Sequence, residues 1–395
     1  MKRLQKALLL IAFSGSLSLA QTVGKPIPIG AALAETSNVA LLGQEEVQGV
    51  KLGEEYVNTH GGINGVPIQV ILEDTGGGEQ GAINAFQLLI KKDQVVGIIG
   101  PVLSQQAFAA DPIADQEQTP VIGPSNTANG IPEIGPFVSR VSAPVAVYAP
   151  GALSYLLSID PKIHRVAQFY AHDDAFSKDE AKVFRAAFRA HHLDIVDVEK
   201  TTTNQTDFIS QITTALAKHP QLIEISTLAA DGGNLVKQLR QFGYKGPIIG
   251  GNGLNTTAIF PVCQQYCTGV YIAEAYSPAL KNPINDWLEA HYQAKYHQEV
   301  PQLTAQAFTA VQVMAVALRR VEAELHRSVV GLPLAKVRVL LNKAIQETRN
   351  LITPLGSISI IPVPKGGGEI HQARFYVAEI VMNPNGKTGV FKYVY

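Results

Sequence analysis

Hydroxyl and amide side chains follow two successive apolar runs in the first third of the chain, and their types suit the binding of a carboxylate. Ser104 follows the run Val95–Ile99, and Ser125, Asn126 and Thr127 follow the next apolar run. Ser104 is placed to cap a helix, whose first N–H groups lack backbone partners and attract anions. Each residue alone could be only a cap or a turn residue. Their occurrence at successive strand ends favours a binding site.

Sequence motifs of the common enzyme classes are lacking from the chain after its N-terminal segment. There is no G-x-S-x-G elbow, no H-E-x-x-H and no Walker loop. Residues 76–81 satisfy G-x-G-x-x-G, but a dinucleotide site also needs an acidic residue at the end of the next strand. Gly100 and Pro101 stand there instead. We therefore predict a loop at 76–81, no cofactor, and a protein that is not an enzyme.

Clusters of charged residues offer little support for a metal centre or an acid/base pair. His191 and Asp194 stand at a predicted helix end among other charged residues, which favours solvated surface over metal binding. Two acidic pairs, Glu45-Glu46 and Glu54-Glu55, fall within one predicted helix. We predict that both pairs lie on its solvent-facing side, and we predict no metal site.

Length and composition indicate an ordinary globular protein of two domains. The chain has 395 residues, of which 46% are hydrophobic and 16% charged, with a formal net charge of −1. There is no dense Lys/Arg block with interleaved aromatic residues, so we predict no nucleic-acid partner. After the N-terminal segment no apolar run is long enough for a transmembrane helix.

The N-terminus has the pattern of an export signal. Basic residues precede a short apolar core, and Ser18-Leu19-Ala20 offers the small residues that a signal peptidase recognises. A membrane anchor is the alternative, but the apolar core falls short of the roughly 20 residues that span a bilayer. We predict that residues 1–20 are a signal peptide, cleaved near Ala20.

The two cysteines stand close together in the segment PVCQQYCTG. In an oxidising compartment Cys263 and Cys267 are expected to form a disulfide. Two free buried thiols are the alternative. A metal site would need more ligands than this loop offers.

Apolar runs and helical patterns alternate along the chain in two units of similar build. The strands are continuous apolar runs, which is typical of parallel sheets covered by helices. The Pro- and Ala-rich stretch 141–150 is predicted to join the units, and later helices are predicted to return the chain to the first lobe before it crosses once more. We therefore predict an α/β fold of two doubly wound parallel-sheet lobes, with the first lobe over 26–145 and 280–354 and the second over 146–279 and 355–395.

Several segments give this chain a specific resemblance to a known family. They include LGQEEVQGVKLGEEYVNTHGGINGVPIQVILEDT, GIIGPVLSQQ, PVIGPSNT, YAHDDAFS, LVKQLRQFGYKGPIIGGNGL and GVYIAEAYSP. The chain resembles the leucine/isoleucine/valine family of type I periplasmic solute-binding proteins that serve ABC importers. The resemblance implies two lobes joined by a three-strand hinge, a ligand held in the cleft between them, and location in the periplasm. It also implies a monomer that carries a neutral or branched-chain amino acid to an ABC permease in the inner membrane.

By position, Ser104, Ser125 and Thr127 resemble the carboxylate clamp of this family. Phe176 stands where the family usually has Tyr, so a ring can still pack over the ligand but a phenolic hydrogen bond is lost. Asn252 stands where the family often has an acid that pairs with the ligand ammonium. A buried ammonium needs a counter-charge.

This departure leaves the polar partners of the ligand open. Either another acid reaches the cleft, or the ligand is not an ordinary α-amino acid. Leu42 and Tyr276, with Leu41, could line the side-chain pocket or be plain core. The candidates for the missing acid are Glu35, Asp231 and Glu274.

Two other function classes remain alongside the solute-binding protein. A ligand-sensing receptor module would use the same cleft, and only its partner would differ. An exported enzyme with an unrecognised site would convert its ligand, whereas a binding protein releases it unchanged.

Overall fold

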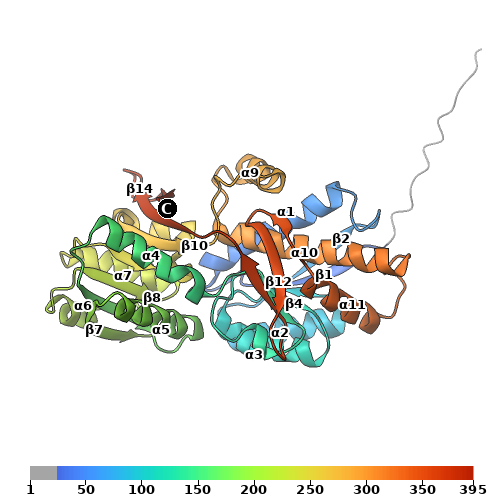
Figure 1. Cartoon of the computed structure of the whole chain (residues 1–395), viewed down its shortest axis with the longest axis horizontal. Helices are drawn as coiled ribbons and strands as arrows, with labels where there is room; N and C mark the ends of the chain where they lie inside the picture. The colour runs from blue at the N-terminus through green and yellow to red at the C-terminus, as the bar shows by residue number, and fades with distance from the viewer. Residues whose placement is uncertain (1–24, 395) are drawn as a thin grey trace, which may run out of the picture.

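Two separate β-sheets, each covered by helices, form the two lobes of the protein (Figure 1). The computed structural model describes residues 25–394. One sheet has eight strands in the order β11-β12-β13-β5-β4-β3-β1-β2, and the other has seven in the order β15-β14-β10-β9-β8-β6-β7. Each sheet has a parallel centre and antiparallel strands at one edge. The predicted α/β class with two sheets is confirmed.

The first lobe begins with strands that alternate with helices. Strand β1 lies between β2 and β3, with Gly30 paired to Ile71 and to Ile98. The strands nearest the centre are buried, because helices cover the sheet. Up to the first crossing the elements are β1 (Ile27–Leu33), α1 (Ala40–Thr59), β2 (Ile68–Asp74), α2 (Glu79–Gln87), β3 (Ile98–Ile99), α3 (Ser104–Gln116), β4 (Val121–Gly123) and β5 (Val138–Arg140).

The second lobe repeats this alternation. The predicted connection over 141–150 is shorter in the structure, because helix α4 already begins at Val145. The elements are α4 (Val145–Ile159), β6 (Arg165–Ala171), α5 (Ala175–Ala190), β7 (Asp194–Thr201), α6 (Ile209–Leu216), β8 (Leu222–Ser226), α7 (Ala229–Gln241), β9 (Ile248–Gly250), the 3-10 turns η3 (Asn252–Leu254) and η4 (Thr257–Ile259), α8 (Phe260–Cys263) and β10 (Val270–Glu274).

The chain then returns to the first lobe and crosses back once more. The predicted boundary after residue 354 is wrong, because strands β12 and β13 form a hairpin that extends the first sheet beside β5. The third crossing therefore follows Gln372. The late elements are α9 (Pro283–Tyr296), α10 (Gln302–Leu325), α11 (Leu334–Gln346), β11 (Leu351–Thr353), β12 (Gly356–Pro362) and β13 (Gly368–Gln372) in the first lobe, then β14 (Tyr376–Met382) and β15 (Gly389–Tyr393) in the second.

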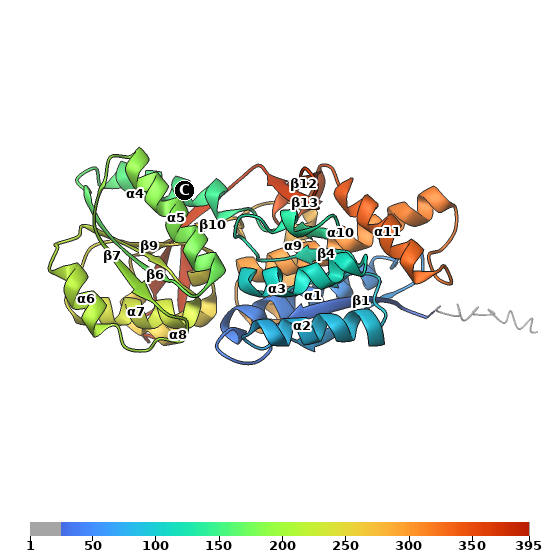
Figure 2. The same cartoon turned by 90° about the horizontal axis from the view of Figure 1, so that it is seen from below.

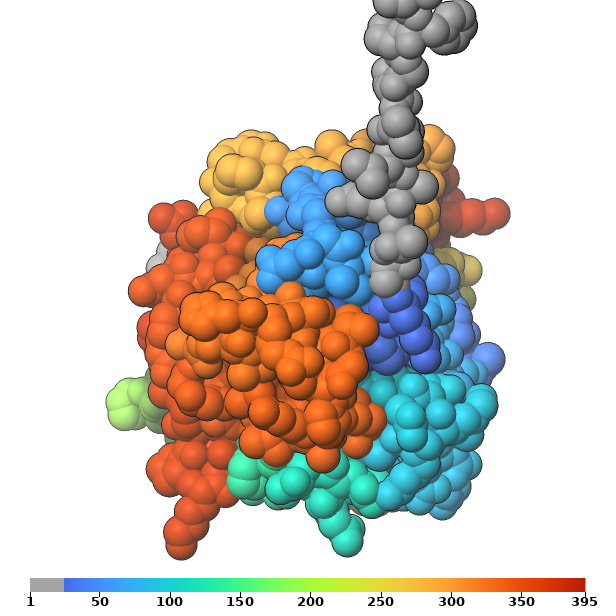
Figure 3. Space-filling model, turned by 90° about the vertical axis from the view of Figure 1, so that its right-hand side faces the viewer, coloured from blue at the N-terminus to red at the C-terminus, as the bar shows by residue number. Residues whose placement is uncertain are grey.

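Three connections thus join the lobes, after β5, after β10 and after β13. Figure 2 shows the ends of α3 and α1 in one lobe directed toward α5 and α7 in the other. Figure 3 shows how the late helices (orange) cover the end of the first lobe beside segments from the start of the chain (blue and cyan). The first lobe is therefore complete only when the chain has returned to it.

Two glycines of helix α1 face its contact with helix α10. A Cβ atom on Gly49 would lie 2.4 Å from the Thr304 carbonyl oxygen, and one on Gly53 would lie 2.8 Å from Val311 Cβ. Side chains at these positions would push the helices apart. The glycines therefore fix α1, which carries several residues of the cleft.

The cysteine prediction agrees with the structure, and the signal-peptide prediction lies outside the described residues. Cys263 and Cys267 form a disulfide with their Cα atoms 5.5 Å apart, both side chains being buried in the second lobe. Within residues 25–394, none of the helices combines the length and the apolar character needed to span a membrane.

Candidate functional site

Residues from both lobes line a small pocket deep between them. Ser104 and Ser125 come from the first lobe, and Phe176 and Asn252 come from the second. The pocket holds only about 20 Å³, which is room for roughly one water molecule. We call it the inner pocket. The residues predicted from widely separated segments therefore do meet, but in a closed arrangement.

Ser104 marks the start of helix α3 at this pocket. The structure places Leu103, not Ser104, at the N-cap position, so the predicted cap is off by one residue. The Ser104 hydroxyl instead accepts a hydrogen bond from the Ala128 backbone N–H (3.2 Å), which ties together the segments that follow β3 and β4. The first N–H groups of α3 lack helical acceptors and suit an anion.

Ser125 is held in place by a buried carboxyl group. Its Oγ lies 2.5 Å from Glu46 Oε1 and 2.8 Å from the Val102 carbonyl oxygen. Burial, with a smaller contribution from the neighbouring Glu45, raises the pKa of Glu46 to about 8. Because one hydroxyl carries one proton, a protonated Glu46 can donate to Ser125 while Ser125 donates to Val102.

Asn126 and Thr127 support the pocket rather than line it. Asn126 Nδ2 donates to the carbonyl oxygens of Pro101 (2.9 Å) and Val102 (3.3 Å), which holds the neighbouring loop. Thr127 is 1% exposed and lines neither cleft pocket. Neither side chain lines a cleft pocket in this arrangement of the lobes.

Arg140 braces this loop, a role that the sequence analysis did not assign. Its guanidinium forms two hydrogen bonds with Glu369 (2.9 and 2.6 Å) and donates to the carbonyl oxygens of Asn126 (2.9 Å) and Ala128 (2.7 Å). Arg140 is 1% exposed, and a bidentate pair of this kind is geometrically specific. A lone arginine at the end of an apolar strand was the available signal.

The second lobe contributes an aromatic ring and an amide. Phe176 lies in the first turn of α5, where the Asp174 carboxylate accepts from the Ser177 N–H (2.8 Å). Asn252 Nδ2 donates to the Ser125 carbonyl oxygen (3.1 Å), and its Oδ1 accepts from Gln302 Nε2 (2.8 Å). Asn252 therefore bonds to two segments of the first lobe.

A larger pocket of about 340 Å³ opens from the same cleft, and we call it the outer pocket. Leu42, Leu103 and Leu228 line both pockets, so the two are contiguous. Among the described residues that line either pocket there is no Lys, Arg or His. The outer pocket contains four acidic residues, namely Glu79, Asp173, Asp174 and Asp231.

Of the three acids considered as partners of an ammonium, namely Glu35, Asp231 and Glu274, only Asp231 lines a cleft pocket. It is 3% exposed and lines the outer pocket. Burial raises its pKa to about 7, and the neighbouring carboxylates of Asp173 and Asp174 add to the shift. An ammonium group would relieve both effects, because an opposite charge favours the ionised carboxylate. Gly77 and Gly78 of the glycine-rich loop also line this pocket.

The prediction that Glu45 and Glu46 face solvent is wrong. Glu45 is 5% exposed because the second lobe covers it, and its Oε1 accepts from Thr256 Oγ1 (2.8 Å), Thr257 N (2.9 Å) and Thr257 Oγ1 (2.8 Å). Burial raises the pKa of Glu45 to about 7. On the same helix Glu54 is half-buried and Glu55 is exposed, so the prediction holds fully only for Glu55.

The chain matches the periplasmic binding protein family over residues 26–380. It belongs to this family. A curated relative, Leu/Ile/Val-binding protein homolog 3 of Brucella melitensis, is 25% identical over 80% of this chain and 84% of its own length. These findings confirm the resemblance stated from the sequence. The family consists of extracytoplasmic solute-binding proteins.

Solved structures share the fold. A branched-chain amino acid transporter substrate-binding protein from Streptococcus pneumoniae, in complex with isoleucine, has a TM-score of 0.80 and 22% identity, covering 94% of this chain and 99% of that one. A solute-binding protein from Rhodopseudomonas palustris, in complex with 3,4-dihydroxybenzoic acid, has a TM-score of 0.78 and 22% identity, covering 93% and 96%.

Four other candidate residues of this binding protein lie away from the two cleft pockets. Tyr276 is buried, and its hydroxyl oxygen lies within hydrogen-bond distance of Asn285 Oδ1 (3.0 Å) and Glu289 Oε1 (2.5 Å), so it is part of the core. Glu274 and Glu35 line neither cleft pocket. Leu41 also lines neither, although its carbonyl oxygen accepts from Thr256 Oγ1 (2.7 Å).

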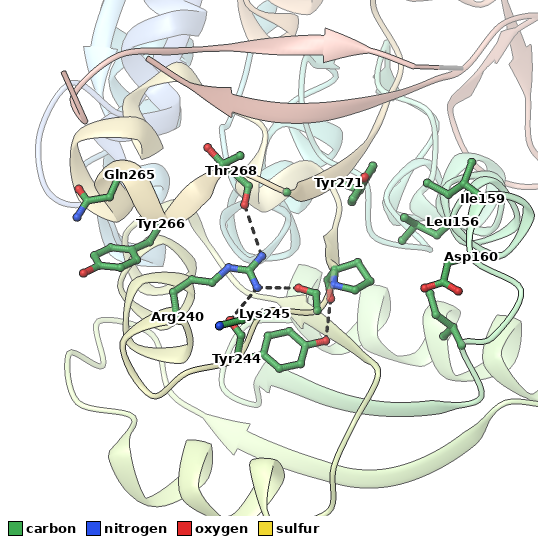
Figure 4. Close-up of a pocket in the computed structure, with 14 residues that line it drawn as sticks. Leu156, Ile159, Asp160, Arg240, Tyr244, Lys245, Gln265, Tyr266, Thr268 and Tyr271 are labelled. Carbon is green, nitrogen blue, oxygen red and sulfur yellow. Dashed lines mark hydrogen bonds between the residues drawn. The ribbon is translucent and has the colours of Figure 1, made fainter. Parts of the chain in front are cut away.

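A hollow of about 540 Å³ lies at the end of the second lobe that is remote from the cleft (Figure 4). The Arg240 guanidinium donates to the carbonyl oxygens of Tyr244 (3.1 Å), Gly246 (2.6 Å) and Thr268 (3.5 Å). These donors tie together the loops that precede β9 and β10. All the residues that line this hollow belong to the second lobe, so lobe closure would not reshape it. No group of three or more His, Cys, Asp or Glu in residues 25–394 is arranged to hold a metal.

Proposed function

We propose that this protein captures a small amino-acid-like ligand in the interlobe cleft outside the cytoplasm and delivers it to an ABC importer. The observation that carries the proposal is the inner pocket, where Ser104 and Ser125 of one lobe meet Phe176 and Asn252 of the other. A ligand that contacts both lobes stabilises their closed arrangement, and that arrangement is what a permease can distinguish.

The polar groups of the cleft suit a zwitterion. The start of helix α3 and the Ser104 hydroxyl provide donors for a carboxylate. Asp231 in the contiguous outer pocket provides the acid for the ammonium that Asn252 cannot pair with. Leu42, Leu103 and Leu228 would surround the ligand side chain, which favours a neutral or branched-chain amino acid. The names of the relatives point to the same class.

Ligand entry requires the lobes to separate, because the inner pocket is too small for an amino acid. The interlobe hydrogen bonds that would break include those from Asn252 to Ser125 (3.1 Å), from Ala175 N to Gln105 Oε1 (3.0 Å) and from Asn38 to Asn204 (2.9 Å). We further propose that the protein acts as a monomer in the periplasm after removal of residues 1–20.

The proposal is tested on protein purified without refolding. Mass spectrometry of the bound small molecules and a thermal-shift screen of amino acids should identify a ligand recovered unchanged. Ser104→Ala should then weaken its binding about ten-fold or more, since a hydrogen bond to a charged group is worth about 1.5–3 kcal/mol.

Asp231→Asn should weaken binding of the amino acid but not of its deaminated analogue. Stabilisation by no small polar metabolite, or conversion of the ligand into a product, would contradict the proposal.

A further inference from the structure

A pocket of about 590 Å³ lies on the hinge side of the molecule, away from the cleft, and we call it the hinge pocket. It is bounded by the end of β10 at Glu274, by residues 297–302 between α9 and α10, and by β15 of the C-terminal hairpin. Both lobes and one of the three connections therefore contribute to it. Its volume falls within the range of roughly 300–1,000 Å³ that is typical of small-molecule sites.

The inner wall of the hinge pocket carries a buried carboxyl group with spare hydrogen-bonding capacity. Glu274 is 1% exposed, and its Oε2 accepts from the Tyr393 hydroxyl (2.9 Å). Its Oε1 is buried and has no hydrogen-bond partner within the described residues. A buried polar atom of this kind costs free energy until a partner reaches it. Burial accordingly raises the pKa of this carboxyl to about 8.

The remaining walls combine apolar surface with a second acid at the rim. The rings of Phe260 and Phe391 stand 5.3 Å apart, and Val300 adds an aliphatic surface. Glu299 lines the exposed side, together with Lys387 and His297. The basic residues His297 and Lys387 are exposed, whereas Glu274 with its unpartnered acceptor is buried. This order suits a ligand that presents its cationic end to the interior and is apolar elsewhere.

We propose that the hinge pocket is a second binding site, which takes a small primary amine attached to an aromatic or aliphatic group. The ammonium donates to Glu274 Oε1, and the apolar part lies against Phe260 and Phe391. The pocket is built independently of the cleft, because none of the residues that line it also lines the inner or outer pocket.

The pocket is nevertheless joined to the cleft through Gln302, one of its lining residues. Gln302 Oε1 accepts from the Ala275 N–H (2.5 Å), next to Glu274, and its Nε2 donates to Asn252 Oδ1 (2.8 Å). Asn252 is part of the inner pocket. The amine site therefore stands directly behind the hydrogen bonds that hold the two lobes together.

Benzylamine is the probe for this site. Benzyl alcohol and benzoate are the control compounds, because they are of similar size but lack the ammonium group. Titration followed by NMR should show saturable binding of benzylamine to the unaltered protein, in about the millimolar range expected for so small a ligand. Glu274→Gln should weaken it at least ten-fold. The rim variant Glu299→Gln and the cleft variant Asp231→Asn should each leave it within about two-fold.

Several results would overturn the proposal. They are the absence of saturable benzylamine binding, equal binding by Glu274→Gln, and equal binding of benzyl alcohol by the unaltered protein. Loss of benzylamine binding in Asp231→Asn would place the amine in the cleft and overturn it as well. The comparison of the three compounds needs no variant, so the proposal stays testable if Glu274→Gln fails to fold. The proposed transport function is judged separately, by the amino-acid screen.

Discussion

Two pairs of glutamates on helix α1 have the same sequence but opposite surroundings. Glu45 and Glu46 are buried between the lobes, with raised pKa values of about 7 and 8. Glu54 is half-buried, and its Oε1 accepts from the Val70 N–H (3.2 Å), while Glu55 is exposed. The difference shows that what packs on a helix decides which of its faces is buried. Here Thr256 and Thr257 of the second lobe contact Glu45, and Ser125 of the first lobe contacts Glu46.

The largest expected effect concerns pH. Glu45 and Glu46 bind protons more tightly in the folded protein than in the unfolded chain, where their pKa is about 4.5. The stability that they contribute is therefore fully present below about pH 4.5 and is lost as the pH rises through 7 and 8. Because one pKa unit is worth about 1.4 kcal/mol, pKa values raised from 4.5 to about 7 and about 8 together correspond to a loss on the order of 6 kcal/mol between pH 5 and pH 8.

Chemical denaturation at pH 5 and pH 8 measures this loss. The double variant Glu45→Gln/Glu46→Gln should lose much less stability over that interval than the unaltered protein, because glutamine does not titrate. The matched variant Glu54→Gln/Glu55→Gln should retain most of the slope. Burial also raises the pKa of other carboxyls, such as those of Asp111 and Glu180. The contribution of Glu45 and Glu46 is therefore read from the difference in pH dependence between the two double variants. Equal slopes in both double variants would contradict the comparison.

A smaller effect is expected from the glycine that holds the buried half of α1 against α10. Gly49→Ala places a Cβ 2.4 Å from the Thr304 carbonyl oxygen and should lower the free energy of unfolding by about 1–3 kcal/mol. Gly151→Ala is the control, since nothing lies within 4 Å of a Cβ there in helix α4. That change should be neutral or stabilising. Thermal unfolding distinguishes the two, and equal melting temperatures would show that α1 is free to shift.

The smallest effect is expected at the exposed pair. Glu55 lies 3.8 Å from Lys295, and both side chains are largely in solvent. Exposed ion pairs are worth about 0–1 kcal/mol, so Glu55→Gln should change the melting temperature by no more than a degree or two, and less in high salt. If Glu55→Gln changed stability as much as the substitution of Glu45 and Glu46 does, the exposure of these glutamates would not predict their contribution to stability.

The parts of the cleft that lie at strand ends could be predicted from the sequence. Ser104 and Ser125 each follow an apolar run, and adjacent parallel strands place their carboxyl ends at one edge of a sheet, so their proximity followed. Phe176 and Asn252 could be assigned only through the family resemblance. Glu46 was missed because the apolar residues of α1 define one buried side, and nothing in its own segment shows that Ser125 meets the other.

The lobe boundary and the position of Tyr276 could not be predicted from local sequence patterns. The apolar runs of β12 and β13 suit an edge strand in either sheet, and only the pairing with β5 assigns them to the first. Tyr276 follows a crossing, and its hydroxyl is satisfied by Asn285 and Glu289 of helix α9. These partners depend on which elements the chain packs against after it crosses between the lobes. Local sequence patterns do not determine that packing.

The three crossings have a practical consequence, because an odd number of passages leaves the chain in the lobe where it did not begin. Lys25 precedes the first strand of one sheet, and Lys392 lies on the outermost strand of the other, both at the surface. A donor and an acceptor dye placed at these two sites would be attached to different lobes. Energy transfer between them would report the hinge angle directly, without a label in the cleft.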